Sequence, residues 1–306
     1  RTLITLCGIV FGTFLAVLFT GMGDSMWGKM IDLTARMGGG HITIQHPEYL
    51  ETPSLKRTVK GAAALQAQAL KQPGVQAVMV RVTGNTLLAA GGNSSGAFFM
   101  AIDPNKETPQ TLSLLESIKE GELFKADDKQ GVVMGQKLVE NLGLKLGRKV
   151  VYTVTDKRGE IVSGLARLRG IIKTGSGLDA GLVLLPMAAV REALGYEADE
   201  ATQIAVFVHD QRDVLEVAGR LRAEARPGTA VATWDQVSPE LASFIHMKVA
   251  GNWVMEIIIG ILVAAGIFNT LFVSVMERQR EFGIMMAIGY SPWQLFRLVM
   301  AESAWV

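Results

Sequence analysis

The chain has 306 residues, 49% of them hydrophobic, with 30 basic and 29 acidic residues and a formal net charge of +1. This balance excludes the strongly basic surface expected of a nucleic-acid-binding protein. The single cysteine excludes a framework of disulfides within the chain.

The first predicted element is a transmembrane helix at residues 1–23. Residues 2–23 contain no Asp, Glu, Lys or Arg. At ~1.5 Å per residue, such a helix is about as long as a bilayer core is thick, ~30 Å. Residues 257–276 are also uncharged, which predicts a second span at 247–276. A buried core helix or a cleaved signal peptide fits less well, because both runs are long and no small-residue cleavage site follows the first.

Residues 24–246 are predicted to form a large α+β domain with stalk helices at both ends. The stalk helix at 24–37 continues the first span and ends at Gly38-Gly39-Gly40. Residues 41–46 alternate as a half-buried strand does. The other predicted strands are 75–82, 86–90, 97–102, 150–155, 161–172, 182–185, 204–208 and 229–232, and the other predicted helices are 58–70, 135–142, 187–194, 214–225 and 234–247.

The charges after the second span predict the orientation in the membrane. Arg278 and Arg280 stand in a short segment, 277–292, close to a membrane end. The positive-inside rule places this segment in the cytoplasm, and the domain at 24–246 on the opposite side. Residues 293–306 are apolar again, and they predict the truncated start of a third span.

The cytoplasmic segment contains a short amphipathic pattern. Phe282, Met285, Met286 and Gly289 fall on one face of a helix, and the charged residues lie elsewhere. Such a helix either lies in the membrane interface or presents an apolar face to a soluble partner. Amphipathicity alone favours the interface.

Two segments resemble a known family. FNTLFVSVMERQREFGIMMAIGYSPWQLFRLVMAES, residues 268–303, is similar to the second span, coupling helix and third-span opening of FtsX-like ABC permeases, which include the MacB and Lol types. GVVMGQKLVENLGLKLGRKVVYT, residues 131–153, resembles a block of the MacB-type periplasmic core domain, most closely that of the lipoprotein-releasing Lol branch. Arg148 departs from this block, where the family usually has Asp.

The resemblance implies a permease without catalytic residues that transmits mechanical work in a bacterial inner membrane, with its large domain in the periplasm. It implies a second permease subunit and a cytoplasmic ABC ATPase, which binds the ATP and Mg. A coupling helix would contact the ATPase. Its polar contacts would be Glu277, Arg278, Arg280 and Glu281, and its apolar contacts Phe282, Ile284, Met285 and Ile288, with Gly289 at its end.

Small residues occur at helical spacing in both predicted spans, at Gly8 and Gly12 and at Gly260 and Ala264. Small residues let membrane helices approach closely, although such spacings are also common by chance. Elsewhere the four histidines lack zinc-site spacing and no hydrolase nucleophile motif occurs. We therefore expect no catalytic, metal or cofactor site in this chain.

Two functions stay open. In the first, the spans accept lipid anchors and the domain passes lipoproteins, or other lipid-linked cargo, to a periplasmic carrier. In the second, the domain is a lever that drives MacB-type efflux or activates a cell-wall hydrolase, as FtsX-type permeases do. The periplasmic blocks favour the first. The short connection at residues 158–168 favours the second, because it lacks the proline-bearing hook of carrier-binding permeases.

Overall fold

The computed structural model describes residues 2–303, and the side chains of residues 2–9, 15, 16, 19, 24, 270, 302 and 303 lie outside the description. The chain divides into two compact units. A helical unit contains the residues up to Trp27 and those from Ser243 onward, and a core unit contains Gly28–Ala242.

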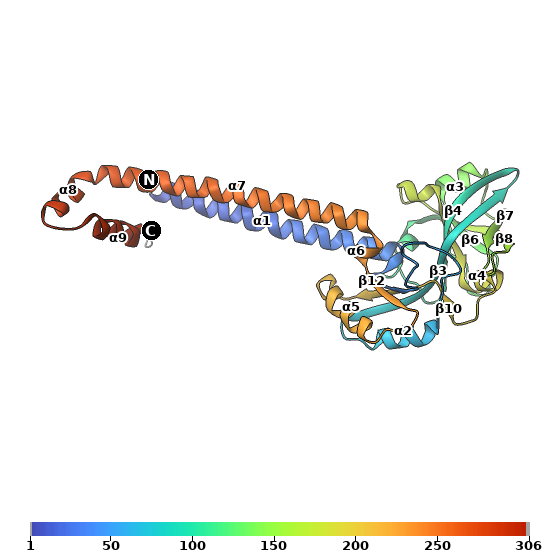
Figure 1. Cartoon of the computed structure of the whole chain (residues 1–306). Coiled ribbons are helices and arrows are strands. Elements are labelled where there is room, and N and C mark those ends of the chain that lie inside the picture. The colour runs from blue at the N-terminus through green and yellow to red at the C-terminus, as the bar shows by residue number, and fades with distance from the viewer. Residues whose placement is uncertain (1, 304–306) are drawn as a thin grey trace. The chain divides into compact units, whose positions relative to one another are not determined.

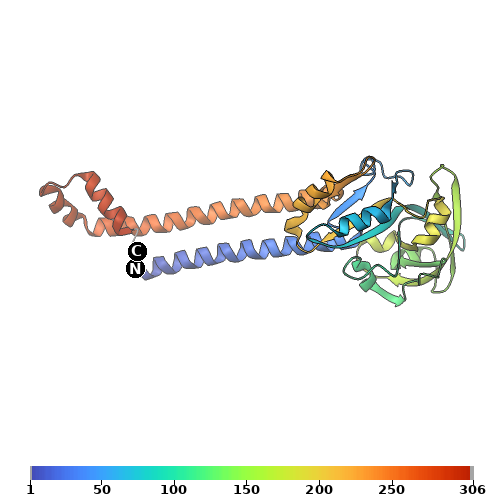
Figure 2. The ribbon, with the colours of Figure 1, turned by 90° about the horizontal axis from the view of Figure 1, so that it is seen from below.

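The helical unit contains most of two long helices, α1 (Thr2–Thr34) and α7 (Pro239–Glu277). It also contains two short helices, α8 (Gln279–Ala287) and α9 (Pro292–Ser303). Within this unit α1 and α7 lie side by side and antiparallel (Figures 1 and 2). The chain reverses at α8, and α9 runs back along the end of α7.

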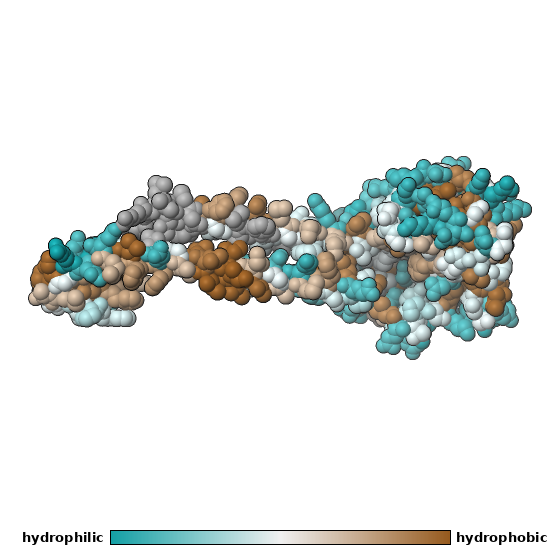
Figure 3. Space-filling view, turned by 90° about the horizontal axis from the view of Figure 1, so that it is seen from above, coloured by the Kyte–Doolittle hydropathy of each residue, from teal (hydrophilic) through white to brown (hydrophobic). Residues whose placement is uncertain are grey.

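Apolar side chains cover much of the described surface of the helical unit (Figure 3). By length and composition, α7 qualifies as a membrane span, and it is the one such helix found among the described residues. The predicted span at 2–23 is helical, but its crossing of a membrane stays a prediction. The predicted third span lies on α9, and its last three residues, 304–306, are outside the described part.

Four strands of the core unit form a split β-α-β arrangement. They are β1 (Ile42–Gln45), β3 (Val75–Ala90), β11 (Gln203–Val208) and β12 (Ala230–Thr233), in the antiparallel order β12-β1-β11-β3. Helix α2 (Ala62–Leu70) connects β1 to β3, and α5 (Val214–Ala223) connects β11 to β12. Both helices contribute side chains to the core on one face of this sheet.

The segment between β3 and β11 builds a second lobe on the far half of β3. Its strands are β4 (Asn93–Ile102), β5 (Ile118–Gly121), β6 (Gly131–Gly135), β7 (Lys149–Thr155), β8 (Ile161–Ile172) and β9 (Leu182–Pro186). Pairing runs β3-β4-β9-β6-β8-β7 and returns to β3, so these strands close into a barrel. The interior is filled by apolar side chains, among them Leu88, Phe99 and Leu168.

The remaining elements of the core unit are short. The helices are α3 (Gln136–Asn141), α4 (Met187–Leu194) and α6 (Trp234–Val237). Two short strands, β2 (Val59–Lys60) and β10 (Glu200–Ala201), pair with each other. The helical turns are η1 (Ala35–Gly39), η2 (Ser113–Ser117), η3 (Gly177–Ala180) and η4 (Gln211–Asp213).

Several predicted elements are confirmed and others are wrong. The strand at 161–172 and the helix at 187–194 have the predicted bounds. The two strands predicted at 75–82 and 86–90 are one strand, because Gly84 and its neighbours continue the pairing with β4. The helix predicted at 234–247 breaks at Ser238, where α6 ends and Pro239 starts α7.

The sequence pattern predicts a half-buried strand at 41–46. The strand is confirmed, but the predicted degree of burial is wrong. Every residue of β1 is buried, because β1 lies between β11 and β12 and is covered on both faces. The core with α2 and α5 covers one face, and the turn η1 after the stalk covers the other. The hydroxyl of Thr43 donates to the carbonyl of Gly39 in that turn at 2.6 Å.

Candidate functional site

The predicted coupling segment is a separate helix. Helix α7 ends at Glu277, Arg278 leaves the helical conformation (φ −102°, ψ 13°), and α8 begins at Gln279. The Arg278 guanidinium lies 2.8 Å from Glu281 Oε2 and 5.7 Å from the centre of the Phe282 ring. These contacts at spacings of three and four stabilise the first turn of α8.

The C-terminus of α8 is closed by a Schellman motif. The backbone N–H of Tyr290 donates to Met285 O at 3.0 Å, and that of Gly289 donates to Met286 O at 3.1 Å. Gly289 has φ = +109°, a conformation that residues with a Cβ rarely adopt. The glycine at the end of the predicted segment therefore stops α8 at a fixed point.

The next helix, α9, starts at Pro292 with a capping box. The backbone N–H of Ser291 donates to Gln294 Oε1 at 2.8 Å, and the backbone N–H of Gln294 donates to Ser291 Oγ at 3.3 Å. Pro292 occupies the first helical position, where its missing N–H costs nothing. With both helix ends capped, the turn between α8 and α9 is fixed locally.

The predicted contact residues lie together on α8 and its ends, but not on one face. Ile284 and Ile288 are 61% and 76% exposed and stand four residues apart. Phe282 and Met285 are half-buried. The amphipathic pattern groups Phe282 with Met285 and Met286, and of these three only Met286 is exposed, at 49%. Ile284 and Ile288, which the predicted contact set also contains, are more exposed.

Two aromatic residues that the sequence analysis did not include extend this apolar surface. Tyr290 is 52% and Trp293 66% exposed, and the Trp293 ring stacks on Phe296 with centroids 5.2 Å apart. Their nearness in the chain to Gly289 was the available signal. Exposed apolar side chains therefore also occur after the end of α8, as far as the first turn of α9.

The predicted small-residue positions differ in their surroundings. A Cβ on Gly12 would lie 3.1 Å from Val263 of α7, so the two helices approach closely there. Thr20 also donates to Glu256 Oε1 at 2.8 Å between the same helices. A Cβ on Gly260 would meet no atom within 4 Å, and Ala264 is exposed. The surroundings of Gly8 lie outside the description.

In the core unit, a buried ion pair holds the turn that follows the stalk. Arg81 on β3 places Nε 2.7 Å from Glu107 Oε1 and Nη2 2.9 Å from Glu107 Oε2. Nη2 also donates to Thr111 O at 2.9 Å, and Nη1 donates to the carbonyl of Gly38 in η1. The guanidinium stands 5.7 Å from the Phe207 ring. We call Arg81, Glu107 and Gly38 the stalk joint.

His41 lies next to this joint and is also buried. Its Nδ1 accepts the backbone N–H of Val208 at 3.4 Å, and its Nε2 lies 3.6 Å from Asp32 Oδ1. Burial lowers the pKa of His41, and Arg36 lowers it further, whereas Asp32 opposes the shift. Neither residue is a predicted site residue: the histidines lack zinc-site spacing, and the signal for Arg81, an arginine inside an apolar strand, was missed.

Among the described residues, no three His, Cys, Asp or Glu side chains gather in a way that could hold a metal ion. The arrangement therefore offers a capped surface helix with exposed apolar side chains, and a charged joint between a stalk and a sheet.

Comparison with known proteins identifies the class. Residues 2–224 match the MacB-like periplasmic core domain, and residues 253–306 match the FtsX-like permease C-terminal domain. The lipoprotein-releasing system transmembrane protein LolC of Xylella fastidiosa is 23% identical over 78% of this chain and 58% of its own length. An uncharacterized ABC transporter permease of Methanocaldococcus jannaschii is 24% identical over 100% of this chain and 76% of its own.

Solved structures of the same kind are also similar. The periplasmic region of MacB from Actinobacillus actinomycetemcomitans aligns with 70% of this chain and 98% of its own, at 16% identity and a TM-score of 0.46.

The chain belongs to the FtsX-like ABC transporter permeases that carry a MacB-like periplasmic core domain. It is a membrane permease with an extracytoplasmic α+β domain. As a member of an ABC transporter permease family, the chain is expected to work with an ATPase.

Proposed function

We propose that this permease couples ATP hydrolysis by its partner to periplasmic work, with α8 as the contact to the ATPase. The observation that carries the proposal is α8 itself. It is a short helix whose C-terminus is closed by a Schellman motif, it follows a long apolar helix, and Ile284 and the C-cap residue Ile288 are exposed. Exposed aliphatic side chains on a capped helix suit a groove on a soluble partner.

The proposed organisation follows the sequence-based ranges. Residues 1–23 and 247–276 span a bacterial inner membrane, 24–246 lie in the periplasm, 277–292 contact the ATPase in the cytoplasm, and 293–306 begin a third span. A second permease subunit completes the transporter. The contact residues for the ATPase are Glu277, Arg278, Arg280, Glu281, Phe282, Ile284, Met285, Ile288 and Gly289.

For the work performed, we propose release of lipoproteins or other lipid-linked cargo. The support is the likeness to LolC, whose name describes a lipoprotein-releasing system. One observation favours the alternative of a periplasmic lever. The strands β7 and β8 are joined by a tight turn at residues 156–160, closed by the N–H of Asp156 on Glu160 O at 2.8 Å. This turn leaves no long loop for holding a carrier.

The test uses the full-length protein in mild detergent, as wild type and as an Ile284→Asp, Ile288→Asp double variant. Proteins that co-purify are identified by mass spectrometry, and their ATPase activity is measured with and without lipoproteins. Leu215→Asp is the matched control, because Leu215 is 72% exposed on α5 in the core unit.

We expect an ATPase to co-purify with wild type and with Leu215→Asp, and at least tenfold less with the double variant. Equal recovery from the double variant would refute the role of α8. Stimulation of the ATPase by a lipoprotein would support cargo release, whereas an ATPase that ignores every lipid-linked cargo would favour the lever.

A further inference from the structure

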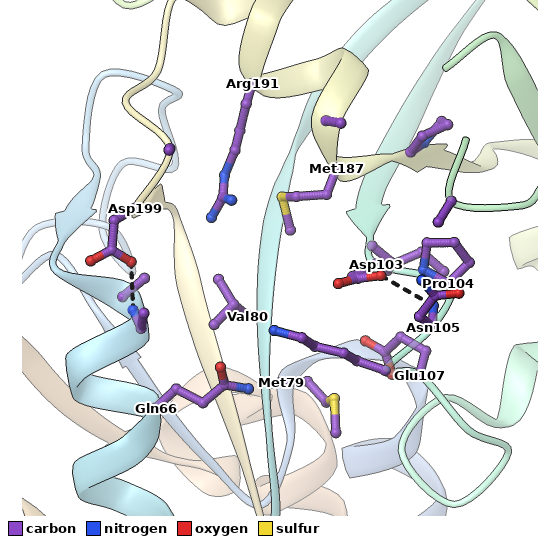
Figure 4. Close-up of a pocket in the computed structure, with 18 residues that line it drawn as sticks. Gln66, Met79, Val80, Asp103, Pro104, Asn105, Glu107, Met187, Arg191 and Asp199 are labelled. Atoms are coloured by element: carbon purple, nitrogen blue, oxygen red, sulfur yellow. Dashed lines mark hydrogen bonds between the residues drawn. The ribbon is translucent and has the colours of Figure 1, made fainter. Parts of the chain in front are cut away.

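The core unit contains a cavity of about 440 Å³ between its two lobes. Its walls are the N-terminal turns of α2 and α4, the middle of β3 and the loop after β4 (Figure 4). Small-molecule sites usually enclose about 300–1,000 Å³, so this cavity has the size for a small ligand. None of the proposed partner contacts on α8 lies in it.

Arg191 is the principal polar group of the cavity. It reaches from α4 towards Val80 on β3 (Figure 4). Its Nε donates to Glu200 O at 3.0 Å, which fixes the side chain. Among the described residues, neither Nη atom of Arg191 donates a hydrogen bond to a protein acceptor. Two parallel donors on a held guanidinium match the two oxygens of a carboxylate or a phosphate.

The other charged groups restrict the charge of the ligand. Lys106 lines the cavity and adds a second positive charge. Asp103 and Asp199 lie on either side of Arg191, and each already accepts a backbone N–H, from Asn105 at 3.1 Å and from Ala63 at 2.5 Å. These carboxylates repel a dianion more than a monoanion. A single carboxylate therefore suits the site better than a phosphate dianion.

The rest of the lining is largely apolar. Met79 and Val80 form one wall, and Met187 extends over the cavity from the start of α4 (Figure 4). An anion with no apolar part would leave these side chains in contact with water, whereas an apolar chain attached to the anion would cover them.

We propose that this cavity binds the carboxylate end of an apolar chain, with Arg191 holding the carboxylate and Lys106 assisting. The apolar chain belongs either to a peptide C-terminus or to a short fatty acid. Glu107 is at once part of the cavity wall and the partner of Arg81, so a ligand here lies beside a member of the stalk joint.

Calorimetric titration of the full-length protein in lipid nanodiscs tests this. The probes are N-acetyl-Leu-Ala as the free acid, the same dipeptide as the C-terminal amide, and hexanoate. The variants are Arg191→Gln and Lys106→Glu. Lys106 is exposed, so its substitution spares the fold. Arg148→Gln is the control, because Arg148 is exposed and lies outside the cavity. No ATPase is needed, so the result is independent of the proposed function.

We expect at least one of the two acids to bind at least tenfold more tightly than the amide, and both cavity variants to lose at least tenfold in affinity. Arg148→Gln should bind as wild type does. Binding of the dipeptide acid alone identifies a peptide C-terminus, and binding of hexanoate alone identifies a fatty acid. Acid and amide of equal affinity, unchanged binding in Lys106→Glu, or no binding beyond that of empty nanodiscs would overturn the proposal.

Discussion

Arg81 and Glu107 form a two-point ion pair in which the side chains are 0% and 2% exposed and Nε lies 2.7 Å from Oε1. Arg81 also donates to the carbonyl of Gly38, in the turn that ends the stalk. One guanidinium therefore joins three segments: β3, the loop after β4, and the end of the stalk. Displacement of the stalk turn must either carry this group along or break its contacts.

Removing one partner of this pair should destabilise the protein strongly. Glu107→Gln leaves the Arg81 charge buried without a counter-charge, which costs about 3–5 kcal/mol. Thermal unfolding followed by tryptophan fluorescence measures the loss. Lys129→Gln is the control, because its pair with Glu192 is exposed on both sides and should contribute little. Equal melting temperatures for Glu107→Gln and Lys129→Gln would contradict this account of the joint.

A side chain at Gly40 should distort the start of β1. Gly40 has φ = +74°, and a Cβ there would lie 2.8 Å from Val206 N and 2.9 Å from Val206 O. We expect Gly40→Ala to cost about 1–3 kcal/mol, from the strained backbone alone. Gly219→Ala provides the contrast, because this residue lies inside α5 with no atom within 4 Å of its Cβ, and it should gain about 0.5–1 kcal/mol. Urea midpoints that shift in the same direction for both variants would be inconsistent with this reading.

His41 should make the stability of the core unit fall in mild acid. Because burial lowers the pKa of His41 in the folded state, the unfolded chain takes up this proton first, near its ordinary pKa of about 6.5. This contribution to stability is then fully present above the unfolded pKa and is lost as pH falls below it towards the lower pKa of the folded state. Melting temperatures measured at about one pH unit above and one pH unit below the ordinary pKa show the loss. His41→Asn keeps an acceptor for the Val208 N–H and does not titrate, so most of the difference should vanish, and an unchanged difference would exclude His41 as its source.

Gly289 should be required for coupling to the ATPase. Gly289→Ala strains the Schellman motif and frays the end of α8, next to the exposed Ile288. We expect stimulation of the co-purified ATPase to fall several-fold. The matched control is Gly251→Ala in α7, where a Cβ meets no atom within 4 Å. If Gly289→Ala and Gly251→Ala behave alike, the fixed end of α8 has no role in coupling.

Much of the local structure was predictable because it depends on near neighbours in the chain. The strand at 161–172 and the helix at 187–194 are long enough for their periodicity to show, and glycines ended the stalk and α8 where expected. The short helix was predicted from its own amphipathic pattern, and its coupling role was implied only by the resemblance to FtsX-like permeases. The exposed residues Ile284 and Ile288 were not separated from the half-buried Phe282 and Met285, because the pattern alone does not tell which side chains tertiary contacts cover.

Composition and local pattern by themselves determined that this chain has two uncharged segments long enough for a bilayer, an α+β domain between them, and a short helix that stops just before Gly289. Only the tertiary structure decided that β3 runs unbroken through Gly84, because that residue pairs with Phe99 of β4. It also brought Arg81 to Glu107 and Arg191 to the wall of a cavity. Sheet pairing and buried ion pairs join residues far apart in the chain, and no periodicity within one segment reports such contacts.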